Sequence, residues 1–343
     1  MILGSILHLP EKYFGIYKGI TIMGQVFLKT ILCLTLSIGW LVSVNGPVSA
    51  DTQWSLTDPA QRLGFAPPGP TDPAELEAFF DEITVRQMES YHIPGGVIAV
   101  VKDGEQFFCK GYGYANLEKR IPFQPEKSLV RIASITKLFT WTAVMQQVEQ
   151  GKLDLNADVN TYLTAFKIPS TFPEPITLLD LMAHTAGFED QNIGIFARSK
   201  QEIPSLGEYL EKHMPARVRP PGKISAYSNY GANLAGYIVT QISGMPYEQY
   251  VQENILDPLS MNRTTAWEPI PDHLIGDLAV DYQYVNGGYE PIPFSYDGTA
   301  PDGSISATAT DMDHFMIAHL QNGRYEGAQI LGADTATLMH SQS

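Results

Sequence analysis

The pattern of apolar and polar positions over residues 97–115 is that of two strands joined by a short polar turn. Residues 97–115, VIAVVKDGEQFFCKGYGYA, contain two apolar runs on either side of Asp103-Gly104. Asp-Gly between two such runs is a strong signal for a tight turn that joins antiparallel strands. This segment therefore predicts a β-hairpin.

Helical patterns lie on both sides of the hairpin. Residues 71–91 predict a helix with Pro73 in its first turn, and residues 153–270 predict several helices separated by Pro and Gly. One of these begins near Thr177, and another is ended by Gly244. The order of elements predicts an α+β fold, in which an antiparallel sheet flanked by helices lies beside a mostly helical region.

The segment RIASITKLFTWTAVMQQVEQGKL, residues 131–153, predicts one amphipathic helix with a lysine on its apolar face. At 3.6 residues per turn, one stripe contains Ser134, Lys137, Leu138, Trp141, Met145 and Val148. Thr136, Gln146, Gln147 and Gln150 fall on the other sides. We therefore expect Lys137 to face the protein interior together with Leu138 and Trp141.

Ser134 and Lys137 are three residues apart, which places them one turn apart on the same helix face. Burial disfavours a charged ammonium group and so favours neutral lysine, which can accept a proton from a serine hydroxyl. A helix N-terminus also favours an oxyanion. Two other interpretations remain open at this point: Ser134 caps the helix, and Lys137 reaches out to water along its apolar stem.

A second candidate site lies in the segment RPPGKISAYSNYGANLAGYIV, directly before a predicted helix. Tyr227 and Asn229 would present a phenol and a carboxamide on one loop. A phenol beside a lysine ammonium loses its proton more easily and can act as a base on serine. Alternatively, Asn229 is the N-cap of the helix and Tyr227 is a partly buried aromatic residue.

The N-terminal residues are typical of a secretory signal peptide. Lys29 precedes an apolar run over residues 30–44, and the small residues of Pro47-Val48-Ser49-Ala50 precede Asp51. We predict a signal peptide over residues 1–50, with residues 1–22 as an upstream extension before Met23, and a linker or arm over residues 51–73. A signal peptide that stays uncleaved would be a membrane anchor, and otherwise the protein is secreted or periplasmic.

Charge and composition narrow the possible partners. The net charge of −15 and the low content of Lys and Arg argue against binding to nucleic acid or to an anionic membrane surface. The 44% hydrophobic content of 343 residues is sufficient for a large core. Because the signal peptide contains Cys33, the mature chain keeps Cys109 alone, which we expect to be a buried apolar residue.

Motifs for several other chemistries do not occur in the sequence. It contains no Gly-x-Ser-x-Gly, no Gly-rich nucleotide motif and no His-Glu-x-x-His, so we expect no cofactor and no metal. Asp311, Asp313 and His314 predict a solvated helix start. His184, in the segment HTAG, is expected to stabilise a turn by hydrogen bonds.

Six ordered segments together resemble one known family. They include PGGVIAVVKDGEQFFCKGYGYA, RIASITKLFTWTAV, ITLLDLMAHTAGF, PPGKISAYSNYGANLAGYIV, ILDPLSMNRTT and GSISATATDMDHF. They are similar to segments of the serine β-lactamase-like family, which comprises class C β-lactamases, penicillin-binding proteins with DD-peptidase activity and related esterases. The resemblance covers residues 75–343 and implies the fold of that family.

The resemblance also implies roles for the candidate residues. Ser134 would be the acylated nucleophile, and its backbone N–H would form half of an oxyanion hole. Lys137 would supply or relay the proton, and Tyr227 would be the general base or proton shuttle. Asn229 would bind the substrate amide and orient the lysine. The substrate would be a β-lactam, a D-alanyl peptide or a carboxylic ester, without a cofactor.

The sequence differs from the family pattern at its end. The family has a third motif, Lys-Thr-Gly or His-x-Gly, on a late strand, and His340 is followed by Ser341 and Gln342 instead. We therefore expect a fragment of a longer chain that lacks the C-terminal strands. The sequence leaves two functions open: an exported serine hydrolase, and a catalytically weak scaffold or binding protein of the same fold. It does not indicate an oligomeric state.

Overall fold

The computed structural model describes residues 70–191 and 195–341, which belong to one compact unit that begins at Pro70. The predicted signal peptide and most of the predicted linker lie outside the described residues. Within the described residues, no helix has both the length and the apolar character needed to cross a membrane.

The predicted hairpin is confirmed and forms the main sheet. Strands β1 (Gly95–Lys102) and β2 (Glu105–Asn116) pair antiparallel, and the short β3 (Ile121–Pro122) extends the order to β1-β2-β3. Asp103 and Gly104 both have positive φ, at 54° and 81°. Two positive φ angles in a two-residue turn match the right-handed twist of the strands, which explains the use of Asp-Gly.

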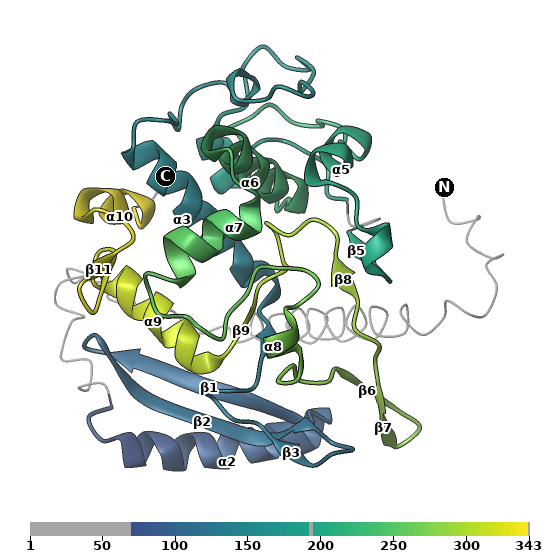
Figure 1. Cartoon of the computed structure of the whole chain (residues 1–343), viewed down its shortest axis with the longest axis vertical. Helices are drawn as coiled ribbons and strands as arrows, with labels where there is room; N and C mark the ends of the chain where they lie inside the picture. The colour runs from purple at the N-terminus through teal and green to yellow at the C-terminus, as the bar shows by residue number, and fades with distance from the viewer. Residues whose placement is uncertain (1–69, 192–194, 342–343) are drawn as a thin grey trace, which may run out of the picture. The chain divides into compact units, whose positions relative to one another are not determined.

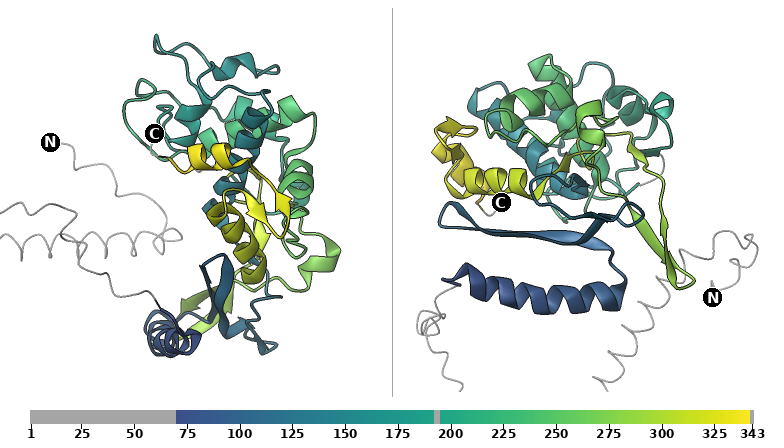
Figure 2. Two further views of the ribbon diagram at one scale, coloured as in Figure 1. Left: turned by 90° about the vertical axis from the view of Figure 1, so that its left-hand side faces the viewer. Right: turned by 60° about the horizontal axis from the view of Figure 1, so that its bottom comes forward.

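Helices cover both faces of this sheet, with α2 (Pro73–Tyr91) on one face and α9 (Ala309–Leu320) on the other (Figures 1 and 2). Helix α2 begins as predicted, because the side chain of Asp72 accepts a hydrogen bond from the Ala74 N–H and a proline follows the cap. Lys110 of β2 forms ion pairs with Glu77 and Asp81 of the helix, which connect the helix to the sheet. The expected layering of helices around an antiparallel sheet is therefore present.

The mostly helical region lies beside the sheet and centres on two long helices (Figure 1). Helix α3 (Thr136–Glu149) packs against α6 (Asn229–Ser243). Shorter helices pack against this pair: α4 (Leu178–Met182), α5 (Leu206–Lys212), α7 (Tyr247–Val251) and α10 (Ala333–Met339). The short helix α8 (Asp272–Ile275) instead packs on Leu129 through Leu274. The predicted start near Thr177 and the stop at Gly244 are confirmed by a Thr177–Asp180 capping box and by a left-handed Gly244.

Short antiparallel strand pairs hold the connecting loops. They are β4 (Val130–Arg131) with β9 (Ser306–Ala307), β5 (Phe196–Ala197) with β8 (Tyr296–Asp297), β6 (Tyr282–Val285) with β7 (Gly288–Pro291), and β10 (Arg324–Tyr325) with β11 (Ala328–Gln329). The pair β4–β9 matters most for the site, because β4 leads directly into the turn that carries Ser134.

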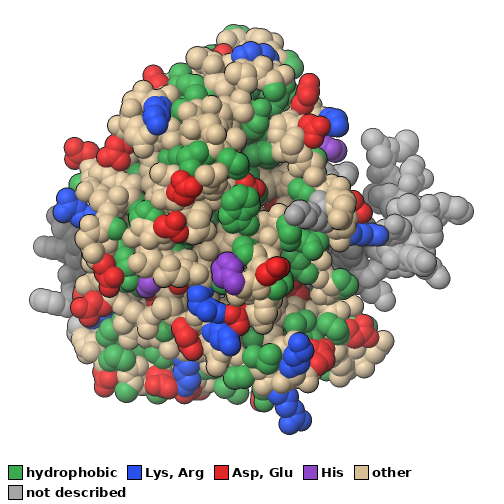
Figure 3. Space-filling view, in the orientation of Figure 1, with side chains coloured by type: hydrophobic (Ala, Val, Ile, Leu, Met, Phe, Trp, Pro, Cys, Tyr) green, Lys and Arg blue, Asp and Glu red, His purple; other side chains and the backbone are tan. Residues whose placement is uncertain are grey.

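On the face shown in Figure 3, acidic and basic side chains are interspersed.

The predicted apolar stripe of α3 is wrong at one of its members. Leu138 is 46% exposed, whereas Lys137, Trp141 and Met145 are buried as expected. Gln147, which was assigned to another side, is also buried and donates to the Tyr250 hydroxyl. Neighbouring elements pack against α3 on most of its sides, so only a narrow strip of the helix meets solvent. A pattern that assumes one buried face therefore places Leu138 inside, although Leu138 lies on the exposed strip.

The predicted solvated start of α9 is also wrong. Asp311 and Asp313 are both buried, and Asp311 accepts hydrogen bonds from the Arg263 N–H and the Thr264 hydroxyl. Asp313 is 1% exposed, and its carboxylate has no hydrogen-bond partner among the described residues. Burial raises the pKa of Asp313 to about 7. Helix α9 is covered by the hairpin at this point, which the local sequence does not reveal.

We predict that Asp313→Asn stabilises the protein at pH 8. The folded-state pKa lies above the unfolded value, so the folded state keeps a proton that the unfolded state has lost. Stability from this group is therefore complete below about pH 4 and falls as pH rises to about 7. Denaturant unfolding at pH 8 should show a gain of roughly 2–3 kcal/mol for Asp313→Asn. Asp334→Asn, at an exposed position on α10, is the control, and an equal gain there would contradict the assignment.

Candidate active site

Ser134 lies in a turn of 3-10 helix, Ala133–Ile135, that joins β4 to α3. The residue before β9 holds the turn in place, because the Ile132 N–H donates to the Ile305 carbonyl and the Ile305 N–H donates to the Thr136 hydroxyl. Ala133 has a φ of 46°, which is unusual for a residue with a side chain. Strained backbone of this kind is characteristic of functional sites. The Ser134 side chain is exposed at the end of a rigid element.

The structure excludes helix capping by Ser134. The N-cap of α3 is Ile135, and no side chain caps this helix. The hydroxyl oxygen of Ser134 instead accepts hydrogen bonds from Lys137 Nζ at 3.1 Å and from the Tyr227 hydroxyl at 2.6 Å. The predicted proximity of Ser134 and Lys137 is therefore present, and Tyr227 joins them from a loop 93 residues along the chain.

Lys137 does not reach out to water. Lys137 is only 4% exposed. Its Nζ donates to the Asp302 carbonyl oxygen at 2.8 Å as well as to Ser134 Oγ. Nζ also lies 4.8 Å from the centroid of the Tyr227 ring, on its face. This position favours a cation, since the face of an aromatic ring carries negative charge. Lys137 is therefore held between the serine, the phenol ring and a backbone carbonyl.

Tyr227 is 48% exposed and lies on the loop that leads into α6. Asn229, two residues later, is the first residue of that helix and is half-buried. The N-cap is Ser228, whose hydroxyl accepts from the Gly231 N–H at 3.1 Å, so the interpretation of Asn229 as the cap is wrong. The Tyr-x-Asn segment thus has one residue that contacts Ser134 and a second at the start of the adjoining helix.

His184 positions the Tyr227 loop from both sides. Its carbonyl accepts from the Ala226 N–H at 2.7 Å, and its Nδ1 accepts from the Ser228 N–H at 3.2 Å. Its ring also packs on the Tyr227 ring with centroids 4.6 Å apart. Burial and the nearby charge of Lys137 lower the pKa of His184, which keeps Nδ1 available as an acceptor. The structural role predicted for His184 is confirmed, and the turn it stabilises is the one that carries Tyr227.

We predict that His184→Ala lowers kcat/KM for any substrate acylated at Ser134 by about tenfold to a hundredfold, because small displacements of a catalytic group are costly. Because the pKa of His184 is lowered, neutral His184 keeps its hydrogen bond from the Ser228 N–H at neutral pH. This hydrogen bond is lost when pH falls below the lowered pKa of His184 and Nδ1 becomes protonated. Steady-state kinetics across pH 5–8 would measure both effects. His273→Ala, at an exposed position on α8, should leave the rate unchanged. An unchanged rate in His184→Ala would contradict the positioning role.

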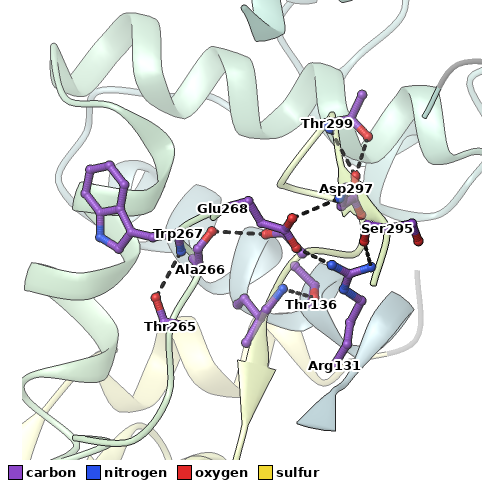
Figure 4. A network of polar contacts seen from close by, with 11 residues as sticks. Arg131, Thr136, Thr265, Ala266, Trp267, Glu268, Ser295, Asp297 and Thr299 are labelled. Atoms are coloured by element: carbon purple, nitrogen blue, oxygen red, sulfur yellow. Dashed lines mark hydrogen bonds and ion pairs between the residues drawn. The ribbon is translucent and has the colours of Figure 1, made fainter. Parts of the chain in front are cut away.

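A buried polar network lies on the other side of Lys137 and was not predicted from the sequence. Figure 4 shows Arg131 directed toward Glu268 and the Ser295 carbonyl, with Glu268 in turn accepting from the Asp297 N–H. Thr299 connects Asp297 to Asp302, with its hydroxyl 2.9 Å and 2.8 Å from their carboxylates. Because Asp302 also holds Lys137 through its carbonyl, the network ends at the site.

The carboxyl groups of this network have raised pKa values. Burial raises the pKa of Glu268 to about 7, although the charge of Arg131 partly opposes the shift. Burial and the neighbouring Asp297 raise the pKa of Asp302 to about 6, and burial also raises the pKa of Asp297. Only the acidic residues of YDGTAPDGS signal this cluster in the sequence, and nothing there indicates that they reach Lys137.

Two further expectations concern thiol and metal chemistry. Cys109 is half-buried on β2, and burial raises the pKa of its thiol to about 11, so the thiol is not an activated nucleophile. Among residues 70–191 and 195–341, no three His, Cys, Asp or Glu side chains are grouped so that they could hold a metal ion.

Comparison with known proteins places this arrangement in a family. The family model described as Beta-lactamase matches residues 80–343. Protein flp of Staphylococcus aureus strain MW2 is 32% identical over 191 residues, which cover 54% of this chain and 37% of that protein. The D-alanyl-D-alanine-carboxypeptidase/endopeptidase AmpH of Escherichia coli K12 is 33% identical over 234 residues, which cover 67% of this chain and 59% of AmpH. The chain thus matches less than two thirds of the length of either relative.

Solved structures show the same fold. The octameric penicillin-binding protein homologue from Pyrococcus abyssi aligns with a TM-score of 0.64 at 27% identity, over 77% of this chain and 60% of that one. A β-lactamase/D-alanine carboxypeptidase from Pseudomonas syringae aligns with a TM-score of 0.61 at 24% identity, over 74% and 67% of the two chains. The α+β fold expected from the sequence is confirmed. With a family model that matches most of its described residues, this chain belongs to the beta-lactamase family.

Proposed function

We propose that the protein is a serine hydrolase that forms an acyl-enzyme on Ser134. One observation carries the proposal: the exposed hydroxyl of Ser134 lies within hydrogen-bond distance of both a buried lysine amine and a tyrosine hydroxyl. A serine becomes nucleophilic when a positioned base removes its proton as the new bond forms. Two groups able to exchange protons converge on this one oxygen, and the serine is open to an incoming carbonyl carbon.

In the proposed reaction, Tyr227 in its phenolate form takes the proton from Ser134. The hydroxyl oxygen of Ser134 bonds to the substrate carbonyl carbon, and the bond from that carbon to the leaving oxygen or nitrogen breaks. The proton on Tyr227 then passes to the leaving group. Water later attacks the acyl carbon and gives a proton to Tyr227. The bond from that carbon to Ser134 Oγ then breaks, and Tyr227 passes the proton to Oγ, so that the acid is released and both residues return to their starting forms. The 2.6 Å separation of the two oxygens supports this assignment.

Lys137 would act as the cation that makes this transfer favourable. Its Nζ has two oxygen acceptors, Ser134 Oγ and the Asp302 carbonyl, and it faces the Tyr227 ring, which is an arrangement suited to an ammonium group. A positive charge at this place stabilises a phenolate on Tyr227 and relays protons between the tyrosine and the serine. Asn229 and the Ser134 N–H would bind the substrate amide and the oxyanion.

The proposed substrates are acyl compounds: a β-lactam, a D-alanyl peptide or a carboxylic ester. AmpH, a D-alanyl-D-alanine carboxypeptidase and endopeptidase, acts on substrates of this class, which supports the proposal.

We also infer export to the periplasm or the cell exterior from the signal-peptide pattern of residues 29–50. N-terminal sequencing of the protein from cells should find a mature chain that begins at Asp51.

Steady-state hydrolysis tests the proposal. Release of p-nitrophenol from p-nitrophenyl acetate, and ring opening of a chromogenic cephalosporin, should both be measured for the full chain and for Ser134→Ala. We expect Ser134→Ala to lose at least about a thousandfold in rate on whichever substrate is turned over. Ser90→Ala, on the exposed side of α2, is the matched control and should retain activity. Equal rates for wild type and Ser134→Ala would contradict the proposal.

A further inference from the structure

A cavity of about 770 Å³ lies among α5, α6, the beginning of α7 and the loop that follows β8. Its volume is in the range of small-molecule sites. Ser134, Lys137 and Tyr227 do not line it, so it is separate from the candidate active site. The described residues that line it include no lysine or arginine but several acidic residues: Glu208, Glu211, Glu248, Glu268 and Asp297.

Two polar side chains on the cavity wall make no hydrogen bond or ion pair to another residue within the described part of the chain. Tyr237 is 8% exposed and its ring stacks on Phe166 with centroids 5.7 Å apart, yet its hydroxyl makes no hydrogen bond. The carboxylate of Glu248 forms no ion pair and no bond to another residue, and burial raises its pKa. Tyr247, on the same wall, differs because its hydroxyl contacts Thr140 at 2.7 Å. The hydroxyl of the buried Tyr237 and the carboxylate of the half-buried Glu248 therefore lie on the cavity wall without a partner on another residue.

The carboxylates of Glu268 and Asp297 on the inner wall have partners, but none of these partners is a cation that lines the cavity. Glu268 pairs with Arg131, which does not line the cavity. Asp297 accepts from the N–H and the hydroxyl of Thr299, at 3.0 Å and 2.9 Å. Desolvated carboxylates are costly unless a cation or several donors face them. The open side of the wall thus offers negative potential without a cation to match it.

We propose that this cavity binds an organic cation, an ammonium or guanidinium group carried on an apolar stem. The cation would face Glu248, Asp297 and the Tyr237 hydroxyl, which is able to accept a hydrogen bond from it. Apolar side chains that complete the lining, Pro204, Leu206, Met245 and Pro246, would contact the stem. A metal ion fits less well, because no three acidic side chains among the described residues are grouped closely enough to hold one.

Isothermal titration calorimetry on the full chain tests this, with 1,6-diaminohexane as the probe and 1,6-hexanediol as its uncharged isostere. The titration is best run at low salt, which screens charges least, and at about pH 8, because burial raises the pKa of Glu248 and of Asp297. We expect saturable binding of the diamine and none of the diol. Glu248→Gln should weaken diamine binding at least about tenfold, because it removes one charge that the cation faces. Tyr237→Phe should weaken it by a smaller factor.

Glu105→Gln is the matched control, since it removes one negative charge from an exposed position at the start of β2. It should bind the diamine as the wild type does. Circular dichroism spectra would verify that each variant is folded. No saturable binding of the diamine up to about 10 mM would overturn the proposal. Equal binding of the diol, or equal weakening in Glu105→Gln, would also overturn it, because it would indicate a response to hydrophobicity or to net charge.

Discussion

Lys137→Met should lower kcat/KM by about a thousandfold or more while the protein stays folded. Methionine keeps most of the apolar stem and the volume of this buried side chain but removes the amine that contacts Ser134 Oγ and the Asp302 carbonyl. The phenolate form of Tyr227 would lose the cation on its ring, and general acid–base catalysis of this kind contributes about 10² to 10⁴ in rate. Lys137→Met removes a buried charge, which favours folding, and two hydrogen bonds, whose loss disfavours it. The two effects partly cancel, so we expect the variant to fold.

Single-turnover acylation, followed by stopped flow with p-nitrophenyl acetate, would measure this effect directly. Lys152→Met is the control, because Lys152 is exposed just beyond the end of α3. Circular dichroism and thermal melting distinguish a loss of chemistry from a loss of fold. Acylation by a folded Lys137→Met protein within about tenfold of the wild-type rate would show that the amine is not part of the reaction.

Tyr227→Phe should lower kcat by about 10² to 10³ with little change in KM. Phenylalanine keeps the ring that packs on His184 and lies over Lys137, so the loop conformation should persist. The variant lacks only the hydroxyl 2.6 Å from Ser134 Oγ. A group that acts in the transition state changes kcat, whereas a group that merely shapes the pocket changes KM.

Tyr91→Phe provides the control for the tyrosine substitution, since Tyr91 is 73% exposed at the end of α2. Its kcat and KM should both match the wild-type values. A rise in KM without a fall in kcat for Tyr227→Phe would assign Tyr227 to substrate binding and would leave Lys137 as the base.

The sequence predicted those parts of the site that depend on local geometry. Ser134 and Lys137 contact one another because residues three apart share a helix face, and the contact holds although Ser134 lies in a 3-10 turn. The hairpin and the start of α2 were also predicted correctly, since turn and cap residues act over a few positions. The approach of Tyr227 to Ser134 was implied by the family resemblance, because no local rule relates residues 93 positions apart.

The failures share one physical cause, which is burial by distant segments. Leu138 is exposed and Asp313 is buried because α6, α9 and the hairpin determine which sides of a helix meet water. The contact between the Asp302 carbonyl and Lys137 spans 165 residues and involves a backbone atom, so residue type carries no signal for it. The acidic cavity is likewise assembled from separate segments.

The most direct test of the central claim is the intact mass of the full chain after incubation with penicillin G, and separately with p-nitrophenyl acetate. We expect a covalent adduct of the mass of the penicillin or of one acetyl group, located on Ser134 by peptide mapping and absent in Ser134→Ala. A folded protein that gains no adduct with either compound, or an adduct that persists in Ser134→Ala, would contradict it.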